Sequence, residues 1–227
     1  MAFLKDKYQN IKAQLDKNNV TLVAVSKTKT VEDILDAYNN GVRDFGENYV
    51  QELVDKYEAL PKDIRWHFIG HLQTNKVKYI AGFVHLIHSV DSEKLLLEIA
   101  KQATKIKRVI DCLLQVYISK DETKFGFDEQ ELEMLIKKME ANNESLKHIS
   151  IKGLMGMATF TEDNGLIETE FNHLKTIFDR HNKAKTESLQ LTILSMGMSA
   201  DYTFGINAGS NMVRIGSLLF GERNYKK

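Results

Sequence analysis

Residues 21–46 read TLVAVSKTKTVEDILDAYNNGVRDFG and show the pattern of a β-strand, a helix and a second β-strand. The run from Thr21 to Ser26 is short, apolar and rich in β-branched residues, which is typical of a buried strand. Apolar residues then recur with the helical spacing i, i+3, i+4 and i+7, at Val31, Ile34, Leu35 and Tyr38. Gly41, which tolerates a positive φ, ends the predicted helix. The second strand is expected from Val42 to Gly46, parallel to the first.

The same alternation continues along the chain. Six further strand-like runs are expected, at 64–69, 83–90, 109–118, 149–157, 189–194 and 212–215. A helix over about residues 2–18 precedes the first strand. Eight strands that alternate with helices imply a parallel sheet covered by helices, and eight such units are the number in a (β/α)8 barrel. A doubly wound open sheet is the alternative fold, and we expect a single domain over residues 1–227.

Composition limits the classes of function. The 227 residues include 31 Lys plus Arg and 31 Asp plus Glu, so no net charge favours nucleic acid or an acidic membrane. The single Cys112 cannot form an internal disulfide, which fits a reducing compartment. The N-terminus is too charged for a signal peptide, and no apolar run approaches the roughly 20 residues that a spanning helix needs. We therefore expect a cytoplasmic protein that binds neither nucleic acid nor membrane, and a monomer.

A lysine follows the first predicted strand directly. In a (β/α)8 barrel the chemistry takes place where strands end and the loops to the helices begin, and Lys27 lies at that point. Partial burial there disfavours the ammonium form, lowers its pKa and makes the amine available for a Schiff base. Lys29, two residues on, is a competing candidate. A lysine whose ammonium group simply reaches solvent at the barrel rim is a further interpretation.

Small polar residues follow the last two predicted strands. Gly216 and Ser217 follow the eighth strand, where an oxyanion could approach the glycine backbone and accept a hydrogen bond from the serine hydroxyl. Loops after strands 7 and 8 commonly bind phosphate in this fold, at the start of a short helix. Ser195 and Ser199 supply two more hydroxyls after the seventh strand. These loops and a lysine on the first strand together indicate a phosphorylated carbonyl ligand.

Two further polar residues are candidates for the same site. Arg214 lies inside the apolar eighth strand, where a guanidinium group is costly to bury without a partner. It therefore faces a specific group, or forms an ion pair with a carboxylate of a neighbouring strand. Asn48 ends the second predicted strand beside Glu47, and it could hydrogen-bond a ligand ring or the lysine, or cap the next helix.

Three common motifs for nucleotide binding or a serine nucleophile are not found in the sequence. It contains no GxxxxGK[ST], GxGxxG or GxSxG pattern. His67 and His71 are four residues apart, and His85 and His88 are three apart. The first pair begins in a predicted strand and lacks a third ligand, so we expect no metal site.

Six motifs in order along the chain resemble the YggS/PROSC family of pyridoxal 5′-phosphate (PLP) homeostasis proteins, over essentially the whole length. They are AVSKTK (24–29), FGENYVQE (45–52), HFIG (67–70), GLM (153–155), SMGMS (195–199) and MVRIG (212–216). The resemblance implies a fold-type III, alanine-racemase-like barrel with PLP as cofactor. It implies a Schiff base on Lys27 and not on Lys29, and Arg214 beside the ring nitrogen. It further implies phosphate contacts from Gly216, Ser217 and Ser195 with Ser199 close by, a pocket role for Asn48, and a ring contact from Met196.

The resemblance also implies a role, which is to bind, buffer and deliver PLP, with PLP-dependent apoenzymes as recipients and no established catalytic reaction. An arginine beside the ring nitrogen has no lone pair to accept a proton, so it should weaken the electron sink that PLP enzymes use, although racemases of this fold tolerate it. Such racemases carry a C-terminal β-domain, whereas this chain ends at Lys227.

Two alternatives remain open from the residues, a small PLP-dependent amino-acid racemase with weak activity and a barrel that binds another phosphorylated metabolite. Tyr117, where the family often has Asn, changes one wall of the expected pocket.

Overall fold

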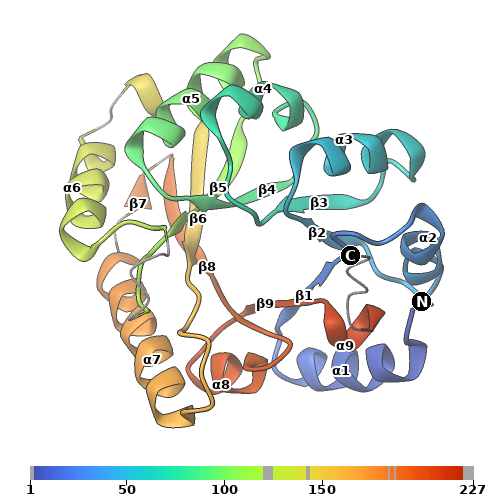
Figure 1. The fold of residues 1–227 in the computed structure, drawn as a ribbon. Coiled ribbons are helices and arrows are strands. Elements are labelled where there is room, and N and C mark those ends of the chain that lie inside the picture. Colours follow the sequence, from blue (N-terminus) through green and yellow to red (C-terminus); the bar gives the residue numbers. More distant parts are fainter. Residues whose placement is uncertain (1–2, 120–124, 142–143, 184, 187, 222–227) are drawn as a thin grey trace.

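The computed structural model describes residues 3–119, 125–141, 144–183, 185–186 and 188–221 (Figure 1). Eight parallel strands form its centre: β1 (Thr21–Val25), β2 (Asp44–Glu47), β3 (Arg65–Phe68), β4 (Leu86–Val90), β5 (Ile110–Gln115), β6 (Ile149–Met155), β8 (Leu189–Met198) and β9 (Met212–Ile215). They pair in the order β6-β5-β4-β3-β2-β1-β9-β8, and the parallel pairing of β6 with β8 closes the ring. The predicted barrel is confirmed, and the open sheet is excluded.

The largest difference between the predicted and the observed strands is at β8. The seventh predicted strand, 189–194, extends in the structure to Met198, so that SMGM belongs to β8 and not to the loop after it. A two-residue strand that was not predicted, β7 (Lys185–Thr186), pairs antiparallel with the beginning of β8.

Helices surround the barrel on its outer side (Figure 1). They are α1 (Lys5–Lys17), α2 (Val31–Asn39), α3 (Val50–Ala59), α4 (Val77–Ile80), α5 (Glu93–Lys105), α6 (Glu129–Glu140), α7 (Asn164–His181), α8 (Tyr202–Asn207) and α9 (Ser217–Phe220), with 3₁₀ turns at Thr74–Lys76 and Glu144–Leu146. Thr30 and Asp128 begin α2 and α6 with capping boxes, which satisfy the free N–H groups of the first turn. Among the described residues, no helix combines the length and apolar character needed to cross a membrane.

Alternation along the strands separates two layers of buried side chains. The larger layer fills the space between strands and helices and includes Leu22, Ala24 and Phe45. A small inner cluster consists of Val23, Leu86, Leu113, Met155 and Met212, one residue from each of five strands. The rest of the buried barrel interior includes polar side chains, in contrast to the aliphatic layers common in this fold.

Close packing across the pairing of β6 with β8 requires a glycine. A Cβ atom on Gly153 would lie 1.7 Å from the carbonyl oxygen of Ile193, its register partner on β8. We expect Gly153→Ala to reduce the free energy of unfolding by roughly 3 kcal/mol, because the two backbones must move apart. A Cβ on Gly82 has no described heavy atom within 4 Å. Gly82→Ala should therefore change stability by less than about 0.5 kcal/mol. Equal losses in denaturant titrations of the two variants would contradict this account.

Candidate functional site

Lys27 follows β1 closely, two residues after Val25, the last residue of the strand. Val23 belongs to the inner cluster, and Ser26 is buried on the opposite side of the strand, where its hydroxyl donates to Glu47. Pairing continues past β1 through the Ser26 N–H, which donates to the Gly46 carbonyl at 3.0 Å. If the alternation continues through Ser26, Lys27 is expected to face inward, and it is half-buried just after the C-terminal end of β1.

Lys29 has a different environment. Its Nζ donates to the Phe220 carbonyl at 2.9 Å, at the end of α9. Between the two lysines, Thr28 has a φ of 64°, a left-handed conformation that is strained for a β-branched residue. This turn separates the two lysines, which the residue pattern does not distinguish.

A buried ionic cluster holds the backbone on both sides of Lys27. The Nζ of Lys56 donates to the Ser26 carbonyl at 2.8 Å, to Glu47 at 2.7 Å and to Glu52 at 2.6 Å. Glu52 also accepts from the Thr28 N–H at 2.5 Å. Glu47 and Lys56 are both buried, and these contacts fix the segment 26–28 from the side of the barrel wall opposite to the inner cluster.

Burial dominates the electrostatics of this cluster. It raises the pKa of Glu47 from 4.5 to about 7, although the Lys56 ammonium and the Ser26 hydroxyl favour the carboxylate. The second carboxylate oxygen of Glu47, Oε2, is buried without a hydrogen-bond partner among the described residues. The charged form of Glu47 is therefore only partly compensated.

The loops after β8 and β9 meet beside the end of β1. The Gly216 N–H donates to the Ser199 hydroxyl oxygen at 3.1 Å. A Cβ on Gly216 would lie 3.2 Å from the Val25 carbonyl oxygen, so the glycine allows this loop to approach β1 closely. Ser217 follows and is exposed at the beginning of α9. The structure thus brings Ser199, Gly216 and Ser217 to the end of the strand that Lys27 follows.

Arg214 extends into the barrel interior and is 4% exposed. Its Nη1 donates to the carbonyl and the hydroxyl oxygen of Ser195, at 2.9 and 2.7 Å, and its Nη2 donates to the Gly156 carbonyl at 3.1 Å. Burial lowers the pKa of Arg214 to about 10. Within the described residues no ion pair joins it to a carboxylate, so the ion-pair interpretation is not supported.

Asn48 lies where β2 ends, and its position depends on Gly70. A Cβ on Gly70 would lie 2.2 Å from the Asn48 carbonyl oxygen, so the glycine of the HFIG motif permits this contact. The Oδ1 of Asn48 is buried without a partner among the described residues. Asn48 does not cap α3, because the N-cap residue is Tyr49.

The structure places two predicted site residues of β8 on opposite sides of the barrel wall, as is usual for neighbours in a strand. Ser195 is buried in the interior, with its hydroxyl on Arg214 and 3.3 Å from the Nδ1 of His88. Met196 is fully buried in the outer layer between strands and helices. The structure therefore does not bring Met196 to the end of the barrel where Lys27, Ser199 and Gly216 meet.

Sequence reasoning missed the polar groups that support this site. Glu52 and Lys56 follow the GEN motif at helical spacing from one another, a weak signal for an ion pair. His67 and His88 face each other inside the barrel, with 2.9 Å between Nδ1 and Nε2. Histidines on two strands that are adjacent in the predicted barrel could have indicated such a contact.

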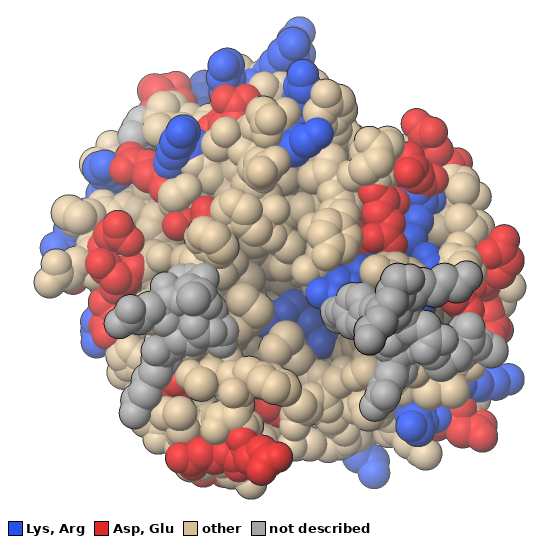
Figure 2. Space-filling view, in the orientation of Figure 1, with Lys and Arg blue, Asp and Glu red and all other residues tan. Residues whose placement is uncertain are grey.

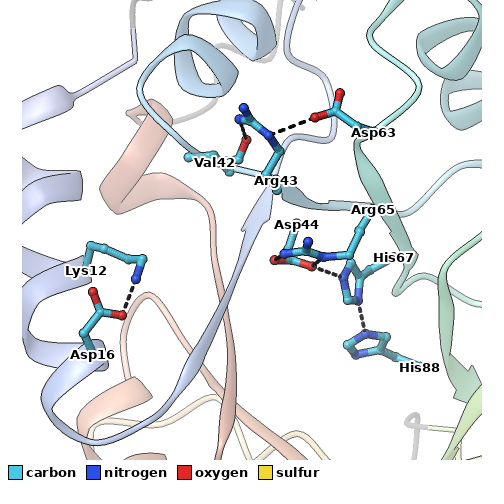
Figure 3. Close-up of polar contacts among 9 residues, drawn as sticks. All are labelled: Lys12, Asp16, Val42, Arg43, Asp44, Asp63, Arg65, His67 and His88. Atoms are coloured by element: carbon cyan, nitrogen blue, oxygen red, sulfur yellow. Dashed lines mark hydrogen bonds and ion pairs between the residues drawn. The ribbon is translucent and has the colours of Figure 1, made fainter.

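A candidate metal site lies at the opposite end of the barrel. Ligand atoms of Asp44, His67 and His85 lie within 4.8 Å of one another. However, both oxygens of Asp44 accept hydrogen bonds from Arg65, and Oδ1 also faces His67 at 3.0 Å (Figure 3). The carboxylate is already neutralised by a guanidinium group, which argues against a cation there.

The hollow above the barrel is basic. Figure 2 looks at the molecule in the orientation of Figure 1 and shows a depression over the centre of the ring, with Lys and Arg side chains at its base. Positive charge inside a concave site favours an anionic ligand.

The raised pKa of Glu47 predicts a pH dependence of stability. A carboxyl group whose pKa is higher in the folded state stabilises the fold below its unfolded pKa and loses that contribution as the pH rises to the folded pKa. The unfolding free energy of the wild type, relative to Glu47→Gln, should therefore fall between about pH 4.5 and 7. A difference of one pH unit between the pKa of a group in the folded and in the unfolded chain corresponds to about 1.4 kcal/mol of unfolding free energy. A difference that is constant over this range, in denaturant titrations, would show that Glu47 keeps an ordinary pKa.

Comparisons with known proteins agree with the fold. The family model described as alanine racemase, N-terminal domain, matches residues 1–224. The pyridoxal phosphate homeostasis protein of Aquifex aeolicus is 41% identical over 210 residues, which cover 92% of this chain and 90% of that protein. The Synechocystis protein of the same name is 40% identical, covering 95% and 97%.

Solved structures give the same result. PipY of Synechococcus elongatus with PLP bound superposes with a TM-score of 0.85 at 32% identity, covering 96% of this chain and 99% of that chain. Alanine racemase of Clostridium difficile has a TM-score of 0.75 at 16% identity, and the match covers 56% of it, so it shows the fold alone. The chain therefore belongs to the alanine racemase N-terminal domain family and, within that family, to the pyridoxal phosphate homeostasis proteins.

Proposed function

We propose that this protein binds PLP as a Schiff base on Lys27 and supplies it to PLP-dependent apoenzymes. The observation that supports the proposal is the close approach of the loops after β8 and β9 to the end of β1. Lys27 follows this end of β1, Gly216 donates to Ser199 in the approaching loops, and Arg214 is buried on β9 two residues before Gly216. PipY, whose structure contains PLP, shares this fold at 32% identity.

The phosphate group fits the loops after β8 and β9. The Ser199 hydroxyl oxygen accepts a hydrogen bond from the Gly216 N–H. A phosphate oxygen could replace this acceptor, and it could also accept a hydrogen bond from the Ser199 hydroxyl. The exposed Ser217 offers a further hydroxyl. The hydroxyl of Ser195 already accepts from Arg214, and we assign it to the support of the arginine and not to the phosphate.

Arg214 suits a ring nitrogen that remains unprotonated. A guanidinium group has donors only, so it can donate to a pyridine lone pair but cannot hold a proton on it. PLP supplies an electron sink to enzymes when its ring nitrogen is protonated. An arginine here favours retention of the cofactor over its catalytic use. The unpartnered Oδ1 of Asn48 is a further proposed contact.

The comparisons favour a carrier over an enzyme. Relatives that are 34–41% identical along this chain are named as homeostasis proteins. The racemases share 16–17% identity, and this chain covers 56–60% of their length. We propose that the carrier acts as a monomer, because its exposed large apolar side chains come from separate elements, such as Tyr79 on α4, Leu97 on α5 and Met134 on α6.

Lys27 and Lys29 form a matched pair of variants. Wild-type protein with PLP should absorb visible light, and borohydride should fix the cofactor to the peptide that contains residue 27. Lys27→Ala should fold but lose this covalent label, because the ammonium of Lys29, the other lysine after β1, is held by the Phe220 carbonyl. Lys29→Ala should keep the label and lose stability only, because its ammonium binds the Phe220 carbonyl. Peptide mass spectrometry after reduction distinguishes the two.

Three results would contradict the proposal. A colourless protein that takes up no PLP would exclude cofactor binding. A label on Lys29 in the wild type would exclude the assignment of the lysine. Steady turnover of amino acids that depends on Lys27 would replace the carrier with an enzyme.

The phosphate contacts are tested separately by comparing PLP with pyridoxal, which lacks the phosphate. Ser199→Ala should weaken PLP binding about 10- to 100-fold, the effect of losing a hydrogen bond to a charged group. Binding of pyridoxal should change little. Thr203→Ala, an exposed residue on α8, is the matched control and should leave both affinities unchanged. Equal losses for PLP and pyridoxal in Ser199→Ala would place the phosphate elsewhere.

A further inference from the structure

A continuous chain of polar side chains crosses the barrel interior. It begins at Asp44, whose Oδ1 is 3.0 Å from Nε2 of His67. The Nδ1 of His67 is 2.9 Å from Nε2 of His88. The Nδ1 of His88 is 3.3 Å from the Ser195 hydroxyl, which accepts from Arg214 at 2.7 Å. Figure 3 shows the first part of this chain, from Arg65 and Asp44 through His67 to His88.

The chain is shielded from water over most of its length. His67 is 1% exposed, and His88 and Ser195 are 0% exposed. Asp44 is at the N-terminal end of β2, where its side chain is 13% exposed and pairs with Arg65. Polar groups buried in this way are costly unless each one is hydrogen-bonded. The four contacts therefore place a strict requirement on where the protons lie.

The two ends of the chain determine its direction. Arg214 can only donate, and an ionised Asp44 can only accept. Three protons remain for the three inner contacts, one each from Ser195, His88 and His67. With both rings neutral, every contact has one proton only if Ser195 donates to His88 and each histidine carries its proton on Nε2. The hydrogen-bond network thus assigns both tautomers.

The charges around the chain agree with this assignment. Burial lowers the pKa of His88 well below its usual value, and the positive Arg214 acts in the same direction. Burial alone would raise the pKa of Asp44, yet hydrogen bonds from His67 and Arg65 lower it to about 2. His88 is therefore neutral and Asp44 is ionised over the ordinary pH range.

We propose that Asp44, His67 and His88 are positioning residues for Arg214. They provide an acceptor for the Ser195 proton, so that a lone pair of the Ser195 oxygen faces the guanidinium and holds it in place. A carboxylate at one end of the barrel thereby orients the cation at the cofactor end. The effect on the cofactor rests on the proposed function, in which Arg214 faces the ring nitrogen of PLP.

The proton positions can be measured without cofactor. In the cofactor-free protein labelled with ¹⁵N-histidine, two-bond ¹⁵N–¹H couplings report the tautomer of each neutral ring. His67 and His88 are assigned by the loss of their signals in His67→Gln and His88→Gln. Both rings should carry the proton on Nε2 at neutral pH, and Asp44→Ala should give a mixture of tautomers at His67. A proton on Nδ1 of either ring in the wild type, or an imidazolium, would overturn the proposal.

The effect on the cofactor is tested with two replacements of His67. Gln can donate to Asp44 and accept from His88, whereas Leu can do neither. His67→Leu should weaken PLP binding about 10- to 100-fold, the cost of disturbing a buried hydrogen bond to a charged group. His67→Gln should restore affinity close to the wild type. Equal affinities in the two variants would overturn the positioning role.

A packing control separates positioning from general damage to the core. Leu86 is the register partner of His67 on β4 and belongs to the inner cluster, but it has no part in the chain. Leu86→Ala should lower thermal stability while PLP affinity stays near the wild-type value. If it weakens PLP as much as His67→Leu, the loss is structural and the proposal fails. A wild type that binds no PLP refutes the proposed function. The tautomer measurement, which needs no cofactor, still tests the proposed proton positions in the chain from Asp44 to Arg214.

Discussion

The buried guanidinium of Arg214 is the constraint on which the interior of this barrel depends. A group that is charged at every physiological pH has been taken out of water, and within the described residues no carboxylate pairs with it directly. It is stabilised by carbonyl oxygens of Ser195 and Gly156 and by one hydroxyl group. The polar interior follows from this, because the hydroxyl must in turn donate its proton to another buried acceptor.

The same requirement explains why the inner apolar cluster is small. A (β/α)8 barrel is usually filled by layers of aliphatic side chains. Here His67, His88, Ser195 and Arg214 occupy part of that volume, and Val23, Leu86 and Met155 belong to the apolar cluster beside them. Stability must then come mainly from the larger layer between strands and helices, where burial of apolar area is extensive.

A second polar system lies on the other side of the barrel wall. Lys56, Glu47 and Glu52 contact the backbone at Ser26 and Thr28, the two neighbours of Lys27. One polar network thus fixes the lysine from outside the wall, while the other holds the arginine from inside it. The proposed cofactor site lies between two rigid supports, which suits a protein that must keep a reactive aldehyde in one orientation.

The eight strands, the barrel class and the loops that meet at one end could be predicted from the residues, because strand and helix periodicities are local and strand ends are visible in the chain. The residues could not distinguish Lys27 from Lys29 without a resemblance, because the turn between them depends on a left-handed Thr28. They could not place Met196 either, because β8 extends four residues beyond its predicted end and the strand determines which side Met196 faces. The chain from Asp44 to Arg214 depends on the folded barrel and has no local signal. His88 and Ser195 are 107 positions apart, and closure of the barrel is what brings their side chains together.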